Sequence, residues 1–295
     1  MKFLKSCQIC NGKLTPIFNL GNQPLCDDLI KIGSNKKNKL FSIKVVFCKK
    51  CIVAYNKVLV PQKKLFPKNY HYRSNLTQDV LSGMKNLVID TKRKYGDLKD
   101  KTIIDIGSND GSLLDIFKSY GAITIGIEPT NAAKISSKHH KIYNNYFSKN
   151  ILKDIKKKYK KVDFITFTNV FAHIDNLKSL ITNLKLLIDK DTKIIIENHY
   201  LGSVIKKKQF DTFYHEHPRT YSLKSLLKIS ELLGLNLDHC SFKKRYGGNI
   251  RVIYGKNKKN FIYKKILDSE KKFFNELLKF DDFIKQWKLH TRKKL

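Results

Sequence analysis

The chain lacks any run of about 18 consecutive apolar residues, which is the length that a helix needs to cross a bilayer. It also lacks the basic, apolar and small-residue leader of a secreted protein and the Gly-Lys-Ser/Thr sequence of a phosphate-binding loop. These absences argue against a membrane span, against export by such a signal and against nucleotide hydrolysis. We therefore expect a cytoplasmic protein with no membrane partner.

Arginine is scarce in this strongly basic chain. Only six of the 59 basic residues are Arg, and with 25 acidic residues the formal net charge is +34. A basic surface attracts phosphate and releases counterions, but bidentate recognition of phosphate or guanine usually requires arginine. Because lysines dominate and are spread along the chain, we interpret them as solvated surface residues and expect no nucleic-acid partner.

The composition of a disordered chain is also missing, because 41% of the residues are hydrophobic and 11% are aromatic. The 295 residues leave room for about two domains of roughly 150 residues each. We find no internal repeat. Residues 1–68, 69–255 and 256–295 carry different motifs, and we predict a small N-terminal domain, a central domain and a C-terminal helical segment.

Four of the six cysteines form two Cys-x-x-Cys pairs, Cys7 with Cys10 and Cys48 with Cys51. Two such pairs can present four thiolates tetrahedrally to zinc, which imposes no competing geometry. Disulfides are the alternative. A metal is favoured because the sequence shows no leader and leaves two cysteines over.

From residue 102 onward, strand-like and helix-like segments alternate, which indicates parallel strands joined by helical crossovers. Strands are predicted at 102–107, 123–127, 163–168 and 192–197, and helices near 111–119, 131–139, 147–159 and 176–188. A helix at 76–95 precedes them, and a helix at 221–233 and two pairing strands at 236–242 and 250–255 follow. We therefore predict an α/β fold with a Rossmann-like sheet that ends in an antiparallel hairpin.

A glycine turn follows the first of these strands and suggests a cofactor site. Gly107 ends that strand, Gly111 opens the next helix, and Glu128 ends the second strand, 21 residues beyond Gly107. In open α/β sheets, ligands bind beyond the carboxyl ends of the strands, where glycine admits them closely and a carboxylate can bind a ribose diol. Two glycines alone are weak evidence, but the strand, the spacing and the acid together predict a nucleotide-type cofactor in a seven-stranded methyltransferase sheet.

A phenol, a carboxylate and two imidazoles occur together in Tyr214-His215-Glu216-His217. Imidazole titrates near neutrality, and a neighbouring carboxylate or phenol can fix its tautomer, so the cluster suits abstraction of a carbon-bound proton. Successive side chains of a strand point to opposite faces, so a turn or loop is required for Tyr214, Glu216 and His217 to converge. The alternative is that the histidines are surface or packed residues.

Several motifs agree in order and spacing with one known family. They are the two Cys-x-x-Cys pairs, Gly21-Asn-Gln-Pro24-Leu, Asp105-Ile-Gly-Ser-Asn-Asp-Gly111, Asn169-Val-Phe-Ala-His173, Tyr214-His-Glu-His217 and Gly247-Gly248-x-x-Arg251. Over nearly all of its length the chain resembles the sugar C-methyltransferases that act on nucleotide-linked deoxy-keto-sugars. The resemblance implies a zinc-binding N-terminal domain, a central domain that binds S-adenosylmethionine, and methylation of a sugar carbon adjacent to a ketone.

The resemblance also implies roles for individual residues. Zinc is expected on Cys7, Cys10, Cys48 and Cys51, S-adenosylmethionine on Asp105, Gly107, Asn109, Gly111, Glu128 and Asn169, the acid–base chemistry on Tyr214, Glu216, His217 and His173, and the substrate on Arg251 and on one of Tyr70 and Tyr72. A C–H bond beside a carbonyl becomes acidic only when the enolate oxygen is stabilised, so the site needs a base and a donor. We expect His217 to be the base and Glu216 to hold or polarise an imidazole. Tyr214 or His173 is then expected to donate to the oxygen.

Two departures from the family pattern stand out. Tyr246 and Asn249 occupy positions where the family usually has histidine and serine, which changes any hydrogen bond made there. Relatives also generally continue into a further C-terminal domain that helps to hold the nucleotide, whereas this chain stops at Leu295. The last segment has apolar residues on one helical face, which we expect to pack on the core, to pair with another subunit or to dock a separate domain. These residues are Ile262, Ile266, Phe273, Leu277, Phe280, Ile284 and Trp287.

Two other functions stay open. One is an RNA-directed methyltransferase, in which the N-terminal domain and the lysines hold phosphate, and which tight, salt-sensitive RNA binding would reveal. The other is a truncated, non-catalytic protein that binds only the cofactor or zinc. Turnover on a keto-sugar nucleotide separates this last function from the enzyme.

Overall fold

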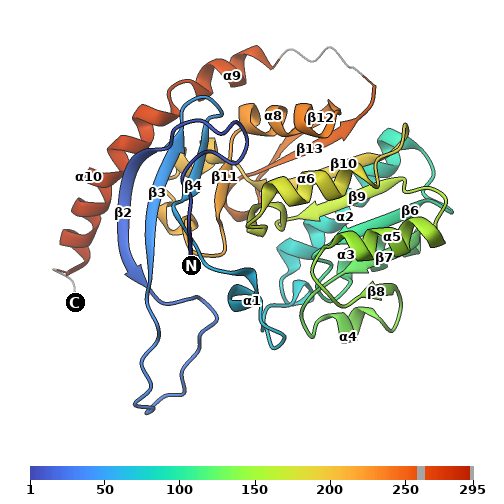
Figure 1. Ribbon diagram of the computed structural model, residues 1–295, viewed down its shortest axis with the longest axis horizontal. Coiled ribbons are helices and arrows are strands. Elements are labelled where there is room, and N and C mark those ends of the chain that lie inside the picture. Colours follow the sequence, from blue (N-terminus) through green and yellow to red (C-terminus); the bar gives the residue numbers. More distant parts are fainter. Residues whose placement is uncertain (258–262, 293–295) are drawn as a thin grey trace.

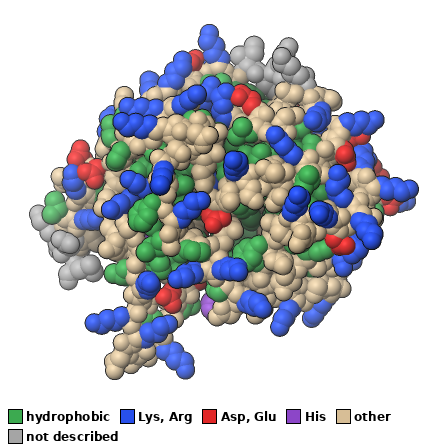
Figure 2. Space-filling view, in the orientation of Figure 1, with side chains coloured by type: hydrophobic (Ala, Val, Ile, Leu, Met, Phe, Trp, Pro, Cys, Tyr) green, Lys and Arg blue, Asp and Glu red, His purple; other side chains and the backbone are tan. Residues whose placement is uncertain are grey.

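The computed structural model describes residues 1–257 and 263–292. Two sheets lie side by side in Figure 1, a small N-terminal sheet and a larger central sheet, and the C-terminal helices run along the outer edge of the small sheet. No helix among these residues is both long enough and apolar enough to pass through a bilayer. Figure 2 shows Lys and Arg side chains scattered over the visible face, with no single basic patch.

The central sheet has seven strands in the order β12-β13-β10-β9-β6-β7-β8. The strands are β6 (Thr102–Ile106), β7 (Ile123–Ile127), β8 (Lys141–Tyr143), β9 (Phe164–Thr168), β10 (Lys193–His199), β12 (Asn236–Lys243) and β13 (Asn249–Gly255). Strands β6 to β10 are parallel, and β13 pairs antiparallel with both β10 and β12. The predicted α/β sheet with a terminal hairpin is confirmed, although the short and partly exposed β8 was not predicted.

Helices cover both faces of this sheet, which explains why β6, β7, β9 and β10 are mainly apolar. They are α2 (Gln78–Tyr95), α3 (Ser112–Ser119), α4 (Ala133–Ser136), α5 (Lys149–Lys158), α6 (Leu177–Lys185), α7 (Leu201–Lys206) and α8 (Leu223–Leu233). Ile103 packs with α2 and α3, whereas its neighbour Ile104 belongs to the core that α5, α6 and α8 cover. This alternation is the two-residue period of a strand. Helix α7 was not predicted, and α4 is shorter than expected.

The small sheet contains a strand from far along the chain. Its order is β11-β4-β3-β2, with β2 (Thr15–Gln23), β3 (Phe41–Cys48), β4 (Val53–Asn56) and β11 (Arg219–Tyr221). Short strands β1 (Lys2–Phe3) and β5 (Val58–Leu59) pair beside it, and α1 (Gln62–Leu65) leads away from it. One hydrophobic cluster runs from the cysteine pairs into the central sheet. The predicted division at residue 68 therefore does not separate two cores, because β11 completes the N-terminal sheet.

The C-terminal helices α9 (Lys264–Glu270) and α10 (Phe273–Arg292) pack on the same chain. Leu277, Phe280 and Ile284 are buried, and the Phe280 ring stacks on Phe18 of β2 with centroids 5.9 Å apart. Trp287 contacts the ring of Phe210 at 5.1 Å. Three packing partners were expected for this apolar face: the core, another subunit or a separate domain. In the residues that the structure describes, the face packs on the core of the same chain. Ile262 lies outside the described residues.

Candidate active site

A cavity of about 650 Å³ opens at the carboxyl ends of β6, β7, β9 and β10, with the segment between α1 and α2 across it. This is the edge at which open α/β sheets bind their ligands. The sequence-predicted residues that line it are Gly107, Asn109, Glu128, Asn169, His173, Tyr70, Tyr72, Tyr214, Glu216 and His217. Asp105, Gly111 and Arg251 are not among the lining residues.

The glycine turn after β6 shapes the wall of this cavity. Gly107 has φ +73°, and an added Cβ would lie 2.6 Å from Val170, which follows the neighbouring strand β9. Gly111 has φ +88° at the start of α3, where a Cβ would lie 2.8 Å from Ser136. Both positions therefore need glycine. Gly111 supports the turn rather than contacting the cavity, and buried Asp105 does the same by accepting a 2.6 Å hydrogen bond from Thr166. Burial raises the pKa of Asp105 to about 7.

Glu128 is fixed at the end of β7 by two backbone donors. Its carboxylate accepts from the N–H of Asn109 at 3.0 Å and from the N–H of Thr130 at 2.8 Å. The side chain of Asn109 in turn donates to the carbonyl of Tyr72 at 3.2 Å, which ties the segment between α1 and α2 to the glycine turn. The carboxylate keeps lone pairs for a further donor, as a ribose diol requires.

The residues Tyr214 to His217 form the turn that the sequence analysis required. The N–H of His217 donates to the carbonyl of Tyr214 at 3.0 Å. Asn56, on β4 of the small sheet, holds both ends of this turn, because its Nδ2 donates to the carbonyls of Tyr214 at 2.6 Å and His217 at 3.2 Å. Tyr214, Glu216 and His217 therefore all line one cavity, while sequence reasoning did not find Asn56.

The hydrogen bonds of His217 define its tautomer. Nδ1 is 2.9 Å from the carbonyl of Thr212, which can only accept, so Nδ1 carries the proton. Nε2 then holds a lone pair and accepts from the Tyr214 hydroxyl at 3.3 Å. Burial, followed by the nearby His173 and His199, places the pKa of His217 well below its usual range. The imidazole is therefore neutral at physiological pH, with its basic nitrogen on the side of Tyr214.

Glu216 contacts Tyr70 with its side chain and His173 with its backbone. Tyr70 donates to the Glu216 carboxylate at 3.2 Å, and Nδ1 of His173 donates to the Glu216 carbonyl at 2.5 Å. The expected contact between the Glu216 carboxylate and an imidazole is thus replaced by one with a phenol. Burial, together with Asp27, raises the pKa of Glu216 to about 7. Of the two tyrosines left open, Tyr70 is the one that contacts the acid–base residues, and Tyr72 lies nearer the glycine turn.

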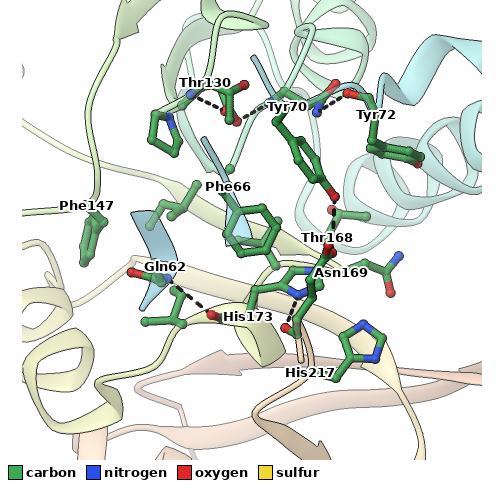
Figure 3. A pocket seen from close by; sticks show the side chains of 18 of the residues that line it. Gln62, Phe66, Tyr70, Tyr72, Thr130, Phe147, Thr168, Asn169, His173 and His217 are labelled. Atoms are coloured by element: carbon green, nitrogen blue, oxygen red, sulfur yellow. Dashed lines mark hydrogen bonds between the residues drawn. The ribbon is translucent and has the colours of Figure 1, made fainter. Parts of the chain in front are cut away.

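Three histidines meet in the cavity, one of them overlooked in the sequence. The ring of His217 stacks on His173 with centroids 5.0 Å apart (Figure 3). It also lies 5.0 Å from the ring of His199 at the end of β10. Desolvation lowers the pKa of His199 to about 4. The sequence could have indicated His199 as a site residue, because it follows the carboxyl end of a predicted parallel strand. His215 instead points away, donating to the carbonyl of Phe41 at 3.0 Å.

Arg251 lies behind the cavity wall, which disagrees with a substrate-binding role. Its guanidinium is buried and pairs with Glu197 of β10 at 2.7 Å and with Asp90 of α2 at 3.0 Å. Strand β13 turns this side chain toward α2, so it supports the sheet instead. Asn249, which stands where the family usually has serine, lies nearby on the same strand. Its amide donates to the side chain of Asn169 at 3.0 Å.

The four cysteines of the two Cys-x-x-Cys pairs meet at the top of the small sheet. Their sulfur atoms all lie within 4.8 Å of one another, and Cys10 and Cys48 are 3.6 Å apart. Asn11 and Ile52, which follow the two pairs, both have positive φ, at 56° and 53°, so the pairs share one backbone turn. Four converging thiols with a closed geometry fit a tetrahedral structural zinc.

Arg219 links this cysteine site to the active-site wall. Its buried guanidinium donates to the side chain of Gln8, inside the first cysteine pair, and to the carbonyl of Ile174, next to His173. Gln8 also donates to the carbonyl of Asp175 at 2.9 Å. The loop that carries His173 is thus attached directly to the first cysteine pair.

Comparison with known proteins agrees with these two regions. Residues 7–66 match a family described as "Putative zinc binding domain". C-methyltransferase NovU of Streptomyces niveus is 24% identical over 253 residues, which are 84% of this chain, and the chain spans 60% of the length of that relative. The chain is also similar to magnesium protoporphyrin IX methyltransferase from Synechocystis PCC 6803, with 15% identity over 60% of this chain and 83% of that chain and a TM-score of 0.47. A second similar structure is the PH0226 protein from Pyrococcus horikoshii OT3, with 10% identity over 66% of this chain and 98% of that chain and a TM-score of 0.48.

The second family match covers the cavity. It is described as "Methyltransferase domain" and spans residues 80–240, which is more than half of the chain. These residues carry the glycine turn, the Glu128 carboxylate and the turn from Tyr214 to His217. The chain therefore belongs to the methyltransferase domain family.

Proposed function

We propose that the chain is a C-methyltransferase that acts on a carbon next to the ketone of a nucleotide-linked deoxy-keto-sugar. The observation that carries the proposal is the neutral His217, whose Nε2 lone pair faces a cavity that also contains the Glu128 end of the cofactor site. Methyl transfer to oxygen or nitrogen can start from an existing lone pair, whereas transfer to such a carbon first requires removal of a proton. The relative NovU, itself a C-methyltransferase, supports this choice.

The chain's own residues supply a route for that proton. The Nδ1–H of His217 stays on the Thr212 carbonyl, so Nε2 is the atom that takes the proton from the sugar carbon. Tyr214, which occupies this lone pair in the structure, must turn its hydroxyl away when substrate enters. The freed hydroxyl can then donate to an oxygen of the substrate. S-adenosylmethionine supplies the electrophilic methyl group.

Glu216 and Tyr70 form a second pair beside the base. The Tyr70 hydroxyl donates to the Glu216 carboxylate, and the Glu216 carbonyl holds Nδ1–H of His173. One residue thereby fixes the orientation of both a phenol and an imidazole at the cavity wall. We assign Glu216 to positioning and Tyr70 to contact with the sugar.

A turnover screen tests the proposal. Purified protein is incubated with S-adenosylmethionine and a panel of nucleotide-linked keto-deoxysugars, and products are analysed by mass spectrometry and carbon NMR. We expect one added methyl group on a carbon adjacent to the ketone. Methylation on oxygen, or methylation of RNA but of no sugar in the panel, would contradict the proposal, and cofactor binding without any turnover would favour a non-catalytic binding protein.

A further inference from the structure

Asn169 and Asn249 form an amide pair whose orientation is set by a buried acid. Nδ2 of Asn249 lies 3.0 Å from Oδ1 of Asn169 and 3.2 Å from Oε1 of Glu197. Glu197 is fully buried and also pairs with the guanidinium groups of Arg245 and Arg251. A carboxylate between two guanidinium groups can only accept hydrogen bonds.

This arrangement determines which way both amides point. Because Glu197 needs a donor, Asn249 must turn its NH2 group toward it, and the second hydrogen of that group goes to Asn169. Asn169 must therefore offer its oxygen to Asn249. Its own NH2 group is left at the other end of the planar amide, and Nδ2 has no hydrogen-bond partner among the described residues. The side chain lines the cavity, so two N–H donors are available to a ligand there.

Three other donors near the base are already used inside the protein. Tyr70 donates to Glu216, His173 donates to the Glu216 carbonyl, and Nδ1 of His217 donates to the Thr212 carbonyl. Asn169 sits at the end of β9, two residues before the short helix of Phe171–His173. Its backbone is in the left-handed region with φ 55°, which asparagine tolerates better than most residues. The free amide is thus presented from a fixed position beside the imidazoles.

We propose that the NH2 group of Asn169 donates to the oxygen of the reacting ketone as the enolate forms, and that Asn249 is a positioning residue that holds this amide in the donating orientation. The inference rests on the proposed function, because it assigns the donor that carbanion formation needs. It also gives Asn249, a departure from the family pattern, a defined task. The Asn169 amide thus contacts the substrate, whereas the Asn249 amide acts only by orienting Asn169.

Asn169→Asp is the direct test, because it keeps the size and the acceptor toward Asn249 but places an oxygen where the NH2 group was. The rate of α-hydrogen exchange with deuterated water is measured with a keto-sugar nucleotide that wild type accepts and with S-adenosylhomocysteine at saturation. Loss of one such donor costs about 100-fold or more in rate, and we expect that loss for Asn169→Asp. The dissociation constant of S-adenosylhomocysteine, measured by calorimetry, should change little.

Asn249→Ala tests the positioning role and should slow exchange roughly tenfold, the size of one well-placed hydrogen bond. Asn249→Ser, which retains one donor, should recover part of the rate. Asn236→Ala on β12 is the matched control, because its amide donates to Lys256 outside the cavity, and it should exchange like wild type. Both thermal melting and cofactor affinity are recorded, so that unfolding is distinguished from lost catalysis.

The outcomes separate this inference from the proposed function. If wild type catalyses α-hydrogen exchange and both Asn169→Asp and Asn249→Ala exchange at the wild-type rate, the inference is overturned and the proposed function still stands. Weakened S-adenosylhomocysteine binding with normal exchange would place the amide on the cofactor and would also overturn it. No exchange by wild type with any keto-sugar would remove the proposed function and this inference with it.

Discussion

His217 and Glu128 mark the two ends of the site at the scale of single residues. One holds a lone pair next to a phenol, and the other holds a carboxylate between two backbone N–H groups. Neither geometry depends on a charged partner close to the ligand. Both are held by hydrogen bonds to the main chain, from Nδ1–H of His217 to the Thr212 carbonyl and from two backbone N–H groups to the Glu128 carboxylate.

Glu128→Ala is predicted to weaken S-adenosylmethionine binding about tenfold or more, because a charged acceptor contributes on the order of 1.5 to 3 kcal/mol to a hydrogen bond. The substitution also frees the N–H groups of Asn109 and Thr130. Calorimetry measures the effect, with Glu231→Ala as a control, since that exposed carboxylate pairs with Lys228 on α8. Equal affinities of wild type and Glu128→Ala would place the cofactor elsewhere.

Glu216→Gln is predicted to change the pH dependence of methylation. Burial raises the pKa of this carboxyl to about 7, so the ionised form that accepts from Tyr70 is lost as the pH falls through 7. Wild type should lose activity on that acidic side, whereas the Gln variant should lack this limb. A raised acid pKa also means that folding favours the protonated form, so the free energy of unfolding of wild type should fall as the pH rises from about 5 to 8, and less so in Glu216→Gln. An acidic limb of the same shape in both proteins would contradict the assignment.

At the scale of secondary-structure elements, the N-terminal sheet positions the turn from Tyr214 to His217. Strand β11 directly follows the turn and pairs with β4, where Arg219 faces Tyr55. Asn56 of β4 then donates to two carbonyls of the turn. The sheet and the turn are therefore one unit, although they are far apart in the sequence.

Asn56→Ala is predicted to lower kcat while leaving cofactor affinity near that of wild type. The His217 carbonyl loses its Asn56 donor, at a cost of about 1 to 3 kcal/mol if it finds no other partner. The Tyr214 carbonyl keeps the His217 N–H but loses its second donor, and the turn that carries His217 loosens. Steady-state kinetics and calorimetry separate the two parameters. Asn22→Ala, on an exposed position of β2 in the same sheet, serves as the control. A variant with normal kcat would show that the turn holds its shape without β4.

The sequence allowed prediction of the central fold and of the turn, but not of their attachment to the N-terminal sheet. Buried strands such as β6 and the glycines at 107 and 111 follow from local pattern and local sterics. The three-residue strand β11 is too short for a periodic signal, and its partner lies more than 160 residues earlier. His199 and Asn56 belong to strands whose ends become neighbours of the turn only after folding. For Arg251 the motif identified the residue, but the sequence could not show that its side chain points away from the cavity.

At the scale of the whole molecule, the cysteine site is connected to the central sheet. Its sulfur atoms belong to the same hydrophobic cluster as the central sheet, and Arg219 connects the first cysteine pair with the loop of His173. The apolar face of α10 closes the other side of the small sheet. A change at the metal is therefore expected to reach the active site.

The purified chain is predicted to contain one zinc on Cys7, Cys10, Cys48 and Cys51, because four thiolates close a structural site and couple the metal to folding. Elemental analysis measures the content. Chelation, or Cys10→Ser, should lower the melting temperature and the methylation rate together, with Cys26→Ser as the control, because Cys26 is exposed and outside the cluster. A metal-free protein with the melting temperature and activity of wild type would contradict this account.

The central claim is that His217 removes a proton from the sugar carbon, and α-hydrogen exchange tests it most directly. Exchange with deuterated water is followed by NMR with a keto-sugar nucleotide and S-adenosylhomocysteine, which has no methyl group to transfer. Wild type and the exposed-residue control His139→Ala should exchange at the same rate, and His217→Ala should be slower by roughly 100-fold or more, as for loss of a general base. Equal protein-dependent exchange by wild type and His217→Ala would show that His217 is not the base.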